Sequence, residues 1–117
     1  MHQAAKMLVD KLVGVRIKAT QKFELGTESL TAAGAASVSV PATFITSSGA
    51  IAITLANGYE GQLKYIILVS DGGTATVTPT SFGNGTTITL DTDYDDWLGI
   101  FHAGSWWTVG TPKGTVS

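Results

Sequence analysis

The sequence predicts an all-β protein, a compact antiparallel β-sandwich or a small β-barrel of the β-tulip kind, with an extended N-terminal arm. Between residues 64 and 110, short runs of apolar residues and threonine are separated by Gly, Asn and Asp, a pattern typical of local hairpins. The same two-residue period recurs between 37 and 55. At 117 residues the chain can bury one modest core, so we expect a single body over 27–117 behind an arm over 1–26.

The arm is predicted to contain a short helix followed by a strand. In residues 1–12, apolar residues such as Leu8 and Leu12 recur at every fourth position, which is typical of an amphipathic helix. An isolated helix of this length is marginal in water, so it would need a surface to dock on. From 13 to 19 the period changes to two, which predicts a strand with one apolar and one basic face.

The body is predicted to contain a series of short strands separated by turn residues. Turn signals include Asn57-Gly58, Asp71-Gly72-Gly73 and Gly83-Asn84-Gly85. The run over 62–70 is the most apolar, which predicts a central strand covered on both faces. The tail after Gly110 is expected to be loose. Strands are expected over 37–40, ended by Pro41, and over 43–46, 51–55, 62–70, 74–78, 86–90, 97–102 and 105–109.

An internal repeat supports a two-layered body. The eleven residues from Ile53 match those from Ile88 at an offset of 35, with the same Ile, Thr, Leu, Tyr and final Leu. Each copy reads as a strand, an acidic loop bearing a tyrosine, and a second strand. Two similar units packed together favour a sandwich or a small barrel.

The charges are few and unevenly placed. Charged residues make up 14% of the chain, against roughly 25% in ordinary soluble domains, which favours a surface partly hidden in an assembly. Residues 1–25 carry five basic and two acidic side chains, and residues 26–117 carry two basic and seven acidic ones. A basic arm therefore precedes an acidic body, which suggests two different surfaces to satisfy. The absence of cysteine excludes disulfides and thiolate metal sites.

The N-terminal residues do not read as a secretion signal, because Asp10 and Lys11 interrupt the apolar run. No run approaches the ~18 apolar residues of a membrane helix, and we expect no membrane partner. The arm lacks the interleaved aromatic residues of a nucleic-acid-binding segment and the body is acidic, so we expect no nucleic-acid partner. Phosphate-binding loops are absent, and we expect no cofactor.

Catalytic constellations are also lacking. The histidines are His2 in the arm and His102 beside a turn, and no Gly-x-Ser-x-Gly elbow occurs. We therefore expect no enzyme activity and assign no catalytic residue. The acidic cluster of Asp91, Asp93, Asp95 and Asp96 has the spacing of the start of a calcium loop, but it lacks that loop's glycine and terminal glutamate. A solvated turn is the favoured reading, and a loosely bound calcium is the alternative.

The adjacent tryptophans Trp106 and Trp107 must point to opposite faces if they lie in a strand. One of them is therefore expected in the core and the other near a surface, where it would make a subunit contact or stack on a sugar. We assign the subunit contact to Trp106.

Residues 58–79, followed by Gly85–Leu90 and Gly104–Gly110, resemble a module of tailed-bacteriophage virion proteins. The pattern is similar to small head-decoration (cement) proteins and to β-modules of phage fibres, and it covers roughly residues 28–110. The resemblance implies a β-rich domain without catalysis, frequent trimers, and a terminal arm or strand that grips a neighbour.

On this basis we expect a capsid decoration protein on the outer shell of a virion, assembled in the host cytoplasm. Its partners would be the major capsid protein and further copies of itself, in a homotrimer. A fibre, tail or collar component is one alternative, and a carbohydrate-binding module that uses Trp106 or Trp107 with the Asp91–Asp96 loop is another. The residues assigned to capsid or subunit contacts are Leu8, Leu12, Val15, Arg16, Ile17, Lys18 and Trp106.

Overall fold

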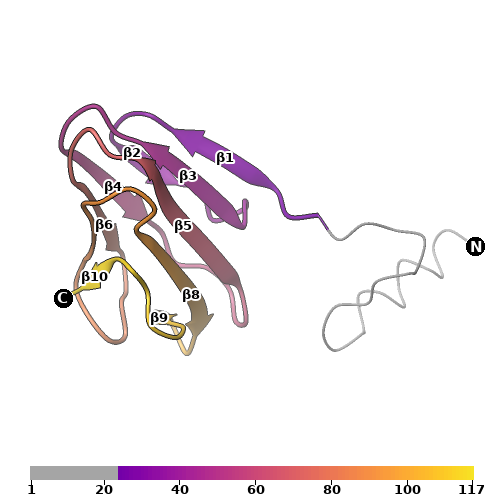
Figure 1. The fold of residues 1–117 in the computed structure, drawn as a ribbon. Coiled ribbons are helices and arrows are strands. Elements are labelled where there is room, and N and C mark those ends of the chain that lie inside the picture. Colours follow the sequence, from indigo (N-terminus) through magenta and orange to yellow (C-terminus); the bar gives the residue numbers. More distant parts are fainter. Residues whose placement is uncertain (1–23) are drawn as a thin grey trace, which may run out of the picture.

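Two five-stranded β-sheets packed against each other make up the part of the chain that the computed structural model describes, residues 24–117 (Figure 1). The first sheet contains, in spatial order, β1 (Thr27–Leu30), β3 (Ala42–Thr46), β5 (Leu63–Ser70), β8 (Asp96–His102) and β9 (Ser105–Thr108). The second contains β10 (Thr115–Val116), β7 (Ile88–Leu90), β6 (Ala75–Pro79), β4 (Ile51–Leu55) and β2 (Gly34–Ala36). Residues 24–117 contain no helix. The all-β prediction is confirmed in the form of a β-sandwich, and the sheets do not close into a barrel.

The strand directions differ from the prediction in the first half of the body. From β1 to β6 each strand lies in the opposite sheet from the one before it. Neighbours within a sheet, such as β1, β3 and β5, are therefore separated by a crossing and run parallel. The pairings made by β7, β8, β9 and β10 are antiparallel, and β8 and β9 form a local hairpin. A fully antiparallel sandwich was the wrong prediction, because most of the turn signals mark crossings between sheets.

The core lies between the sheets and is filled by the alternate residues of each strand that point inward. Trp106 packs edge-to-face against Trp97 and Phe101, with ring centroids 6.2 and 5.2 Å apart. The rest of the core is aliphatic: Ile45, Ile66 and Leu68 from the first sheet, and Ile53, Leu55, Val77, Ile88 and Leu90 from the second.

The internal repeat corresponds to a structural one. In each copy a strand of the second sheet, β4 or β7, leads through a loop into a strand of the first sheet, β5 or β8. The tyrosines of the two loops, Tyr59 and Tyr94, are both exposed. β5 and β8 pair antiparallel, so the two copies meet in the first sheet.

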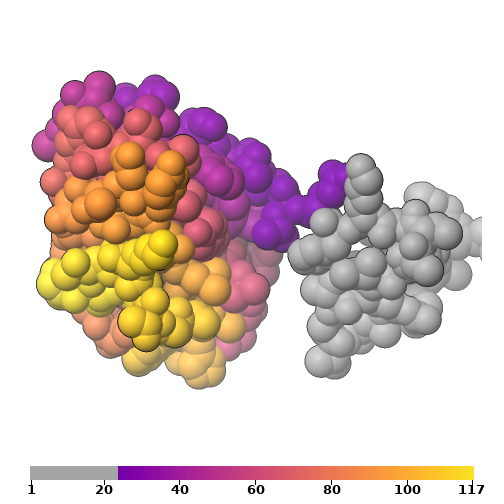
Figure 2. Space-filling view, in the orientation of Figure 1, coloured from indigo at the N-terminus to yellow at the C-terminus, as the bar shows by residue number. Residues whose placement is uncertain are grey.

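Three details correct the predicted elements. Residues 37–40 form a turn, and the strands beside them are β2 and β3. The tail is not loose, because β10 pairs with β7 and Ser117 exchanges two backbone hydrogen bonds with Thr87. Figure 2 shows the C-terminal segment, in yellow, lying against the body. β5 is central, as predicted, but only its inner face is fully covered.

Candidate interaction surface

The outer face of the first sheet carries a continuous set of apolar side chains. Along β5, residues 64, 66 and 68 point inward and are buried, whereas residues 63, 65, 67 and 69 point outward. The strand pairings place these outward residues in rows with those of the neighbouring strands: Leu63 lies opposite Ile100, which lies opposite Trp107. We call this surface the apolar face; its members are Phe44, Leu63, Tyr65, Ile67, Val69, Leu98, Ile100, Trp107 and Val109.

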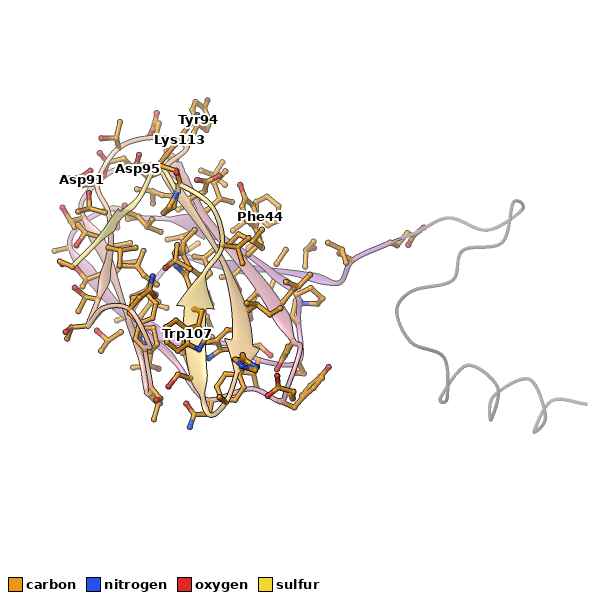
Figure 3. All side chains as sticks on the ribbon, turned by 90° about the horizontal axis from the view of Figure 1, so that it is seen from below. Phe44, Asp91, Tyr94, Asp95, Trp107 and Lys113 are labelled. Atoms are coloured by element: carbon orange, nitrogen blue, oxygen red, sulfur yellow. The ribbon has the colours of Figure 1, made fainter. Side chains whose placement is uncertain are left out.

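Several members of the apolar face are well exposed. Leu63 is 53% exposed, and Phe44, Val69 and Trp107 are 37 to 38% exposed. Monomeric soluble proteins rarely leave a large contiguous apolar patch in water, and such patches mark sites of interaction. Figure 3 shows Phe44, on β3, and Trp107, on β9, at separate positions on the body, and the strands between them in the sheet, β5 and β8, carry most of the other members.

The outer face of the second sheet has a different chemistry. Its outward positions are threonine or alanine, and the strand pairings place Thr54 opposite Thr78 and Thr76 opposite Thr89. Threonine combines a β-branched side chain, which suits a strand, with a hydroxyl group that water can solvate. We call this surface the threonine face; it consists of Ala35, Ala52, Thr54, Thr76, Thr78, Thr87, Thr89 and Thr115.

The two adjacent tryptophans occupy the two sides of the first sheet, in the opposite sense to our assignment. Trp106 is fully buried, and its indole nitrogen donates to the carbonyl of Ala56 at 2.9 Å. It therefore cannot reach a partner while the body is folded, and its predicted contact role is corrected. Trp107 lies on the apolar face. Its indole nitrogen donates to the carbonyl of His102 at 3.0 Å, and its ring lies against Gly83, which leaves no room there for a Cβ atom.

The apolar face has little charge of its own. Asp96, which is not one of its members but lies opposite Ile67, accepts hydrogen bonds from the Tyr65 hydroxyl at 2.8 Å and from the backbone of Lys113 at 3.2 Å. Burial, together with the hydrogen bond to Asp96, raises the pKa of Tyr65 to about 12, so the phenol stays neutral at physiological pH. A partner of this face would therefore meet a nearly neutral surface.

A shallow groove continues the apolar face at the loop before β5. It is lined by Leu25 at the root of the arm, by Tyr59, and by Leu63, which belongs to both surfaces. The carboxylate of Glu60 also lines it and lies 2.5 Å from His102 Nδ1. Hydrogen bonds from His102 and from the backbone of Ala103 hold the pKa of Glu60 below its usual value.

The aspartates of the acidic cluster, for which a solvated turn was expected and a bound calcium was the alternative, are engaged in hydrogen bonds. Asp95 accepts from the backbone of Asp91 and Thr92, and Asp93 accepts from the backbone of Asp71 at 2.6 Å. Within residues 24–117, no three carboxylate or histidine side chains are grouped so that they could hold a metal ion. Figure 3 shows Asp91 and Asp95 away from Trp107, so the loop and the exposed tryptophan do not form one site.

A buried lysine was not foreseen from the sequence. Lys64 points into the sandwich, is fully buried, and donates to the carbonyls of Ser37 and Val40 at 2.6 and 2.7 Å. It also donates to the Thr43 hydroxyl, which in turn donates to Glu28 at 2.6 Å. Its nitrogen is 3.7 Å from the Glu28 carboxylate. This cluster ties β1, the strand that follows the arm, to the central strand β5.

Burial and partners shift the pKa values of this cluster. Burial lowers the pKa of Lys64, and the nearby charge of Glu28 opposes that shift. Burial raises the pKa of Glu28, but hydrogen bonds from Thr43 and Ser37 and the charge of Lys64 together outweigh it and lower the pKa overall. The only sequence signal was a lysine within the apolar run over 62–70.

The remaining predicted contact residues fall outside the described part of the chain: Leu8, Leu12, Val15, Arg16, Ile17 and Lys18, together with the predicted helix, the strand over 13–19 and His2. Within residues 24–117, no helix is long and apolar enough to cross a membrane. No protein-family model and no curated protein matches the sequence.

Proposed function

We propose that this chain is a non-enzymatic structural protein of a bacteriophage particle, most specifically a capsid decoration protein that binds and stabilises the outer shell. The observation that carries the proposal is the apolar face, since a sheet with exposed aromatic and aliphatic side chains is suited to burial against protein. The β-rich body is in keeping with the resemblance to decoration proteins and fibre modules.

In this proposal the arm and the body have separate tasks. The arm carries the net positive charge, and Arg16 and Lys18 would meet acidic patches of the major capsid protein. Leu8, Leu12, Val15 and Ile17 would be its apolar anchors. The body would pack against other copies in a homotrimer, and many copies together would reinforce the shell. Burial of apolar area drives such contacts at about 25 cal/mol per Å², before the costs of association.

Deletion of residues 1–25 tests the role of the arm. We expect the shortened protein to keep its β-sheet circular dichroism and to lose binding to particles that lack decoration. A double variant Arg16→Ser/Lys18→Ser in the full chain tests the two basic residues themselves. Lys113→Ser, which removes one positive charge from an exposed position of the body, is the control. Full binding by the deletion variant would contradict the assignment of capsid binding to the arm.

Two other functions remain as alternatives. A fibre, tail or collar protein would be present in few to dozens of copies per particle, whereas decoration requires hundreds, so quantification against the major capsid protein separates the two. A carbohydrate-binding module is favoured by one observation, the exposed ring of Trp107, since aromatic rings stack on sugars. A glycan array with and without calcium tests it, with Trp107→Ala as the control protein.

A further inference from the structure

We propose that the apolar face is the contact between copies of this chain, and that the threonine face stays in solvent. The inference deepens the structural role proposed above and rests on it, because that role includes self-association without saying which surface makes it. It also predicts an orientation: in an assembly, the first sheet faces its neighbour and the second sheet faces water.

The chemistry of the apolar face favours a second copy as its occupant. The body has a net negative charge, yet its exposed carboxylates lie in loops, as do Asp71, Asp93 and Glu60, and not in the rows of the apolar face. Asp96 is bound to Tyr65 and to the backbone of Lys113. The apolar faces of neighbouring copies can therefore meet, as around the threefold axis of the proposed homotrimer, without placing free like charges in contact.

A charged partner would gain less from this surface. The basic arm or a nucleic acid would find few carboxylates and no cationic cluster among the rows of apolar side chains. An equally neutral and apolar surface is the best match, and the same face on another copy is such a surface. The apolar face differs in this respect from the arm, whose positive charge suits an acidic partner.

The β9 edge of the first sheet also favours a contact through the face of the sheet. The outer edge of β9 is already covered, because Trp106 and the segment Ser81–Gly83 exchange backbone hydrogen bonds of 2.8 and 2.9 Å. In the folded protein, the backbone of β9 therefore cannot pair with a strand of another copy. Within residues 24–117, by contrast, nothing fully covers the apolar face, which includes the outer side of the central strand β5.

The size of the surface predicts a weak contact. From β3 to β9 there are three strand spacings of ~4.8 Å, and from Leu63 to Val69 the strand advances by about 20 Å. These dimensions give a footprint of a few hundred Å² on each copy. Even with the adjoining groove, such an area is at the low end for protein interfaces. Self-association should therefore be reversible and depend on concentration in the micromolar to millimolar range.

Sedimentation equilibrium of the full chain, without particles, tests the inference. The wild-type protein should associate reversibly. The variant Phe44→Lys/Val69→Lys should raise the dissociation constant by about 100-fold, since like charges would face each other across the contact. The control variant Thr54→Lys/Thr115→Lys places the same charges on the threonine face. It should change the dissociation constant by less than about threefold. Circular dichroism confirms that each variant is folded.

A second variant separates lost contact from misfolding. Phe44→Thr/Val69→Thr places a β-branched residue, which suits a strand, at both positions and should also weaken association, with unfolding still cooperative. A wild-type protein that stays monomeric up to millimolar concentration overturns the inference, and so does association that Lys on the apolar face leaves unchanged.

Particle binding, measured on the same variants, keeps the two proposals apart. A chain that binds particles but does not self-associate retains the decoration role and contradicts the self-contact. A chain that self-associates through the apolar face but does not bind particles supports the self-contact and contradicts decoration.

Discussion

The two sheets are alike on the inside and different on the outside. Both turn aliphatic side chains inward, and the first sheet adds Trp97, Trp106 and the buried Lys64. Outward, the second sheet presents threonine and alanine, whereas the first presents the apolar face. A chain with 14% charged residues must cover its surface with neutral polar groups or bury part of it in an assembly. The second sheet is covered by neutral polar threonines. We propose that the first sheet instead buries its apolar face in an assembly.

The largest expected effect on stability is a difference between the inward-facing and the outward-facing tryptophan of the first sheet. Trp106→Ala should lower the free energy of unfolding by about 3–5 kcal/mol, because it leaves a cavity among Trp97 and Phe101. Trp107→Ala should cost about 1 kcal/mol or less, since its ring is partly in water. Urea denaturation at low protein concentration measures both. Equal losses would contradict the inward and outward assignment.

The next effect concerns the buried cluster that only the first sheet contains. Lys64→Met should lower the free energy of unfolding by roughly 3 kcal/mol, because the carbonyls of Ser37 and Val40 lose their donor and Glu28 loses its counter-charge. Lys113→Met, at an exposed lysine of the body, is the matched control and should change it by less than about 0.5 kcal/mol. If Lys64→Met unfolds like the control, the cluster does not stabilise the body.

A smaller, pH-dependent effect comes from Glu28. Its pKa is lower in the folded protein than the ordinary 4.5, so its contribution to stability is present above about pH 4.5 and is lost as the pH falls through the folded pKa. Glu28→Gln should therefore cost about 1–2 kcal/mol at neutral pH and less at pH 3. Denaturation at several pH values measures the difference. A cost that does not shrink in acid would exclude the carboxylate charge as its source.

The smallest effect on stability tests the threonine face. Thr54→Val/Thr78→Val should change the free energy of unfolding by about 0.5 kcal/mol or less, because both side chains are exposed and valine suits a strand. It should nevertheless promote larger assemblies, since the second sheet would then carry an apolar patch of its own. Light scattering measures the size of these assemblies. Thr54→Ser/Thr78→Ser serves as the polar control and should match the wild type.

Much of the strand content could be predicted from the sequence. The expected runs over 51–55, 62–70 and 97–102 agree with β4, β5 and β8 to within one residue at each end, because alternation and turn residues are local signals. The direction of pairing could not be predicted. A glycine-rich turn can close a hairpin or lead to the opposite sheet, and the local pattern is the same in both cases. β1, β2 and β10 are short or lack clear alternation, and they were missed.

The candidate surface could be predicted only in outline. Neighbouring positions in a strand point to opposite faces, so one of Trp106 and Trp107 had to lie on the outer face of the sheet. The alternation alone did not say which. The apolar run in β5 suggested cover on both faces, yet nothing within residues 24–117 covers its outer side chains fully. Lys64 was missed because a buried lysine depends on carbonyls and a carboxylate that come from distant turns and strands.

The proposed contact through the apolar face is tested most directly by hydroxyl-radical footprinting of Trp107 and Phe44 over a range of protein concentrations. We predict that both become protected as the wild-type protein associates, that they stay reactive in a Val69→Lys variant, and that buried Trp97 and Trp106 stay unreactive throughout. Full reactivity of Trp107 and Phe44 in a sample that has associated would contradict the assignment of the apolar face as the contact between copies.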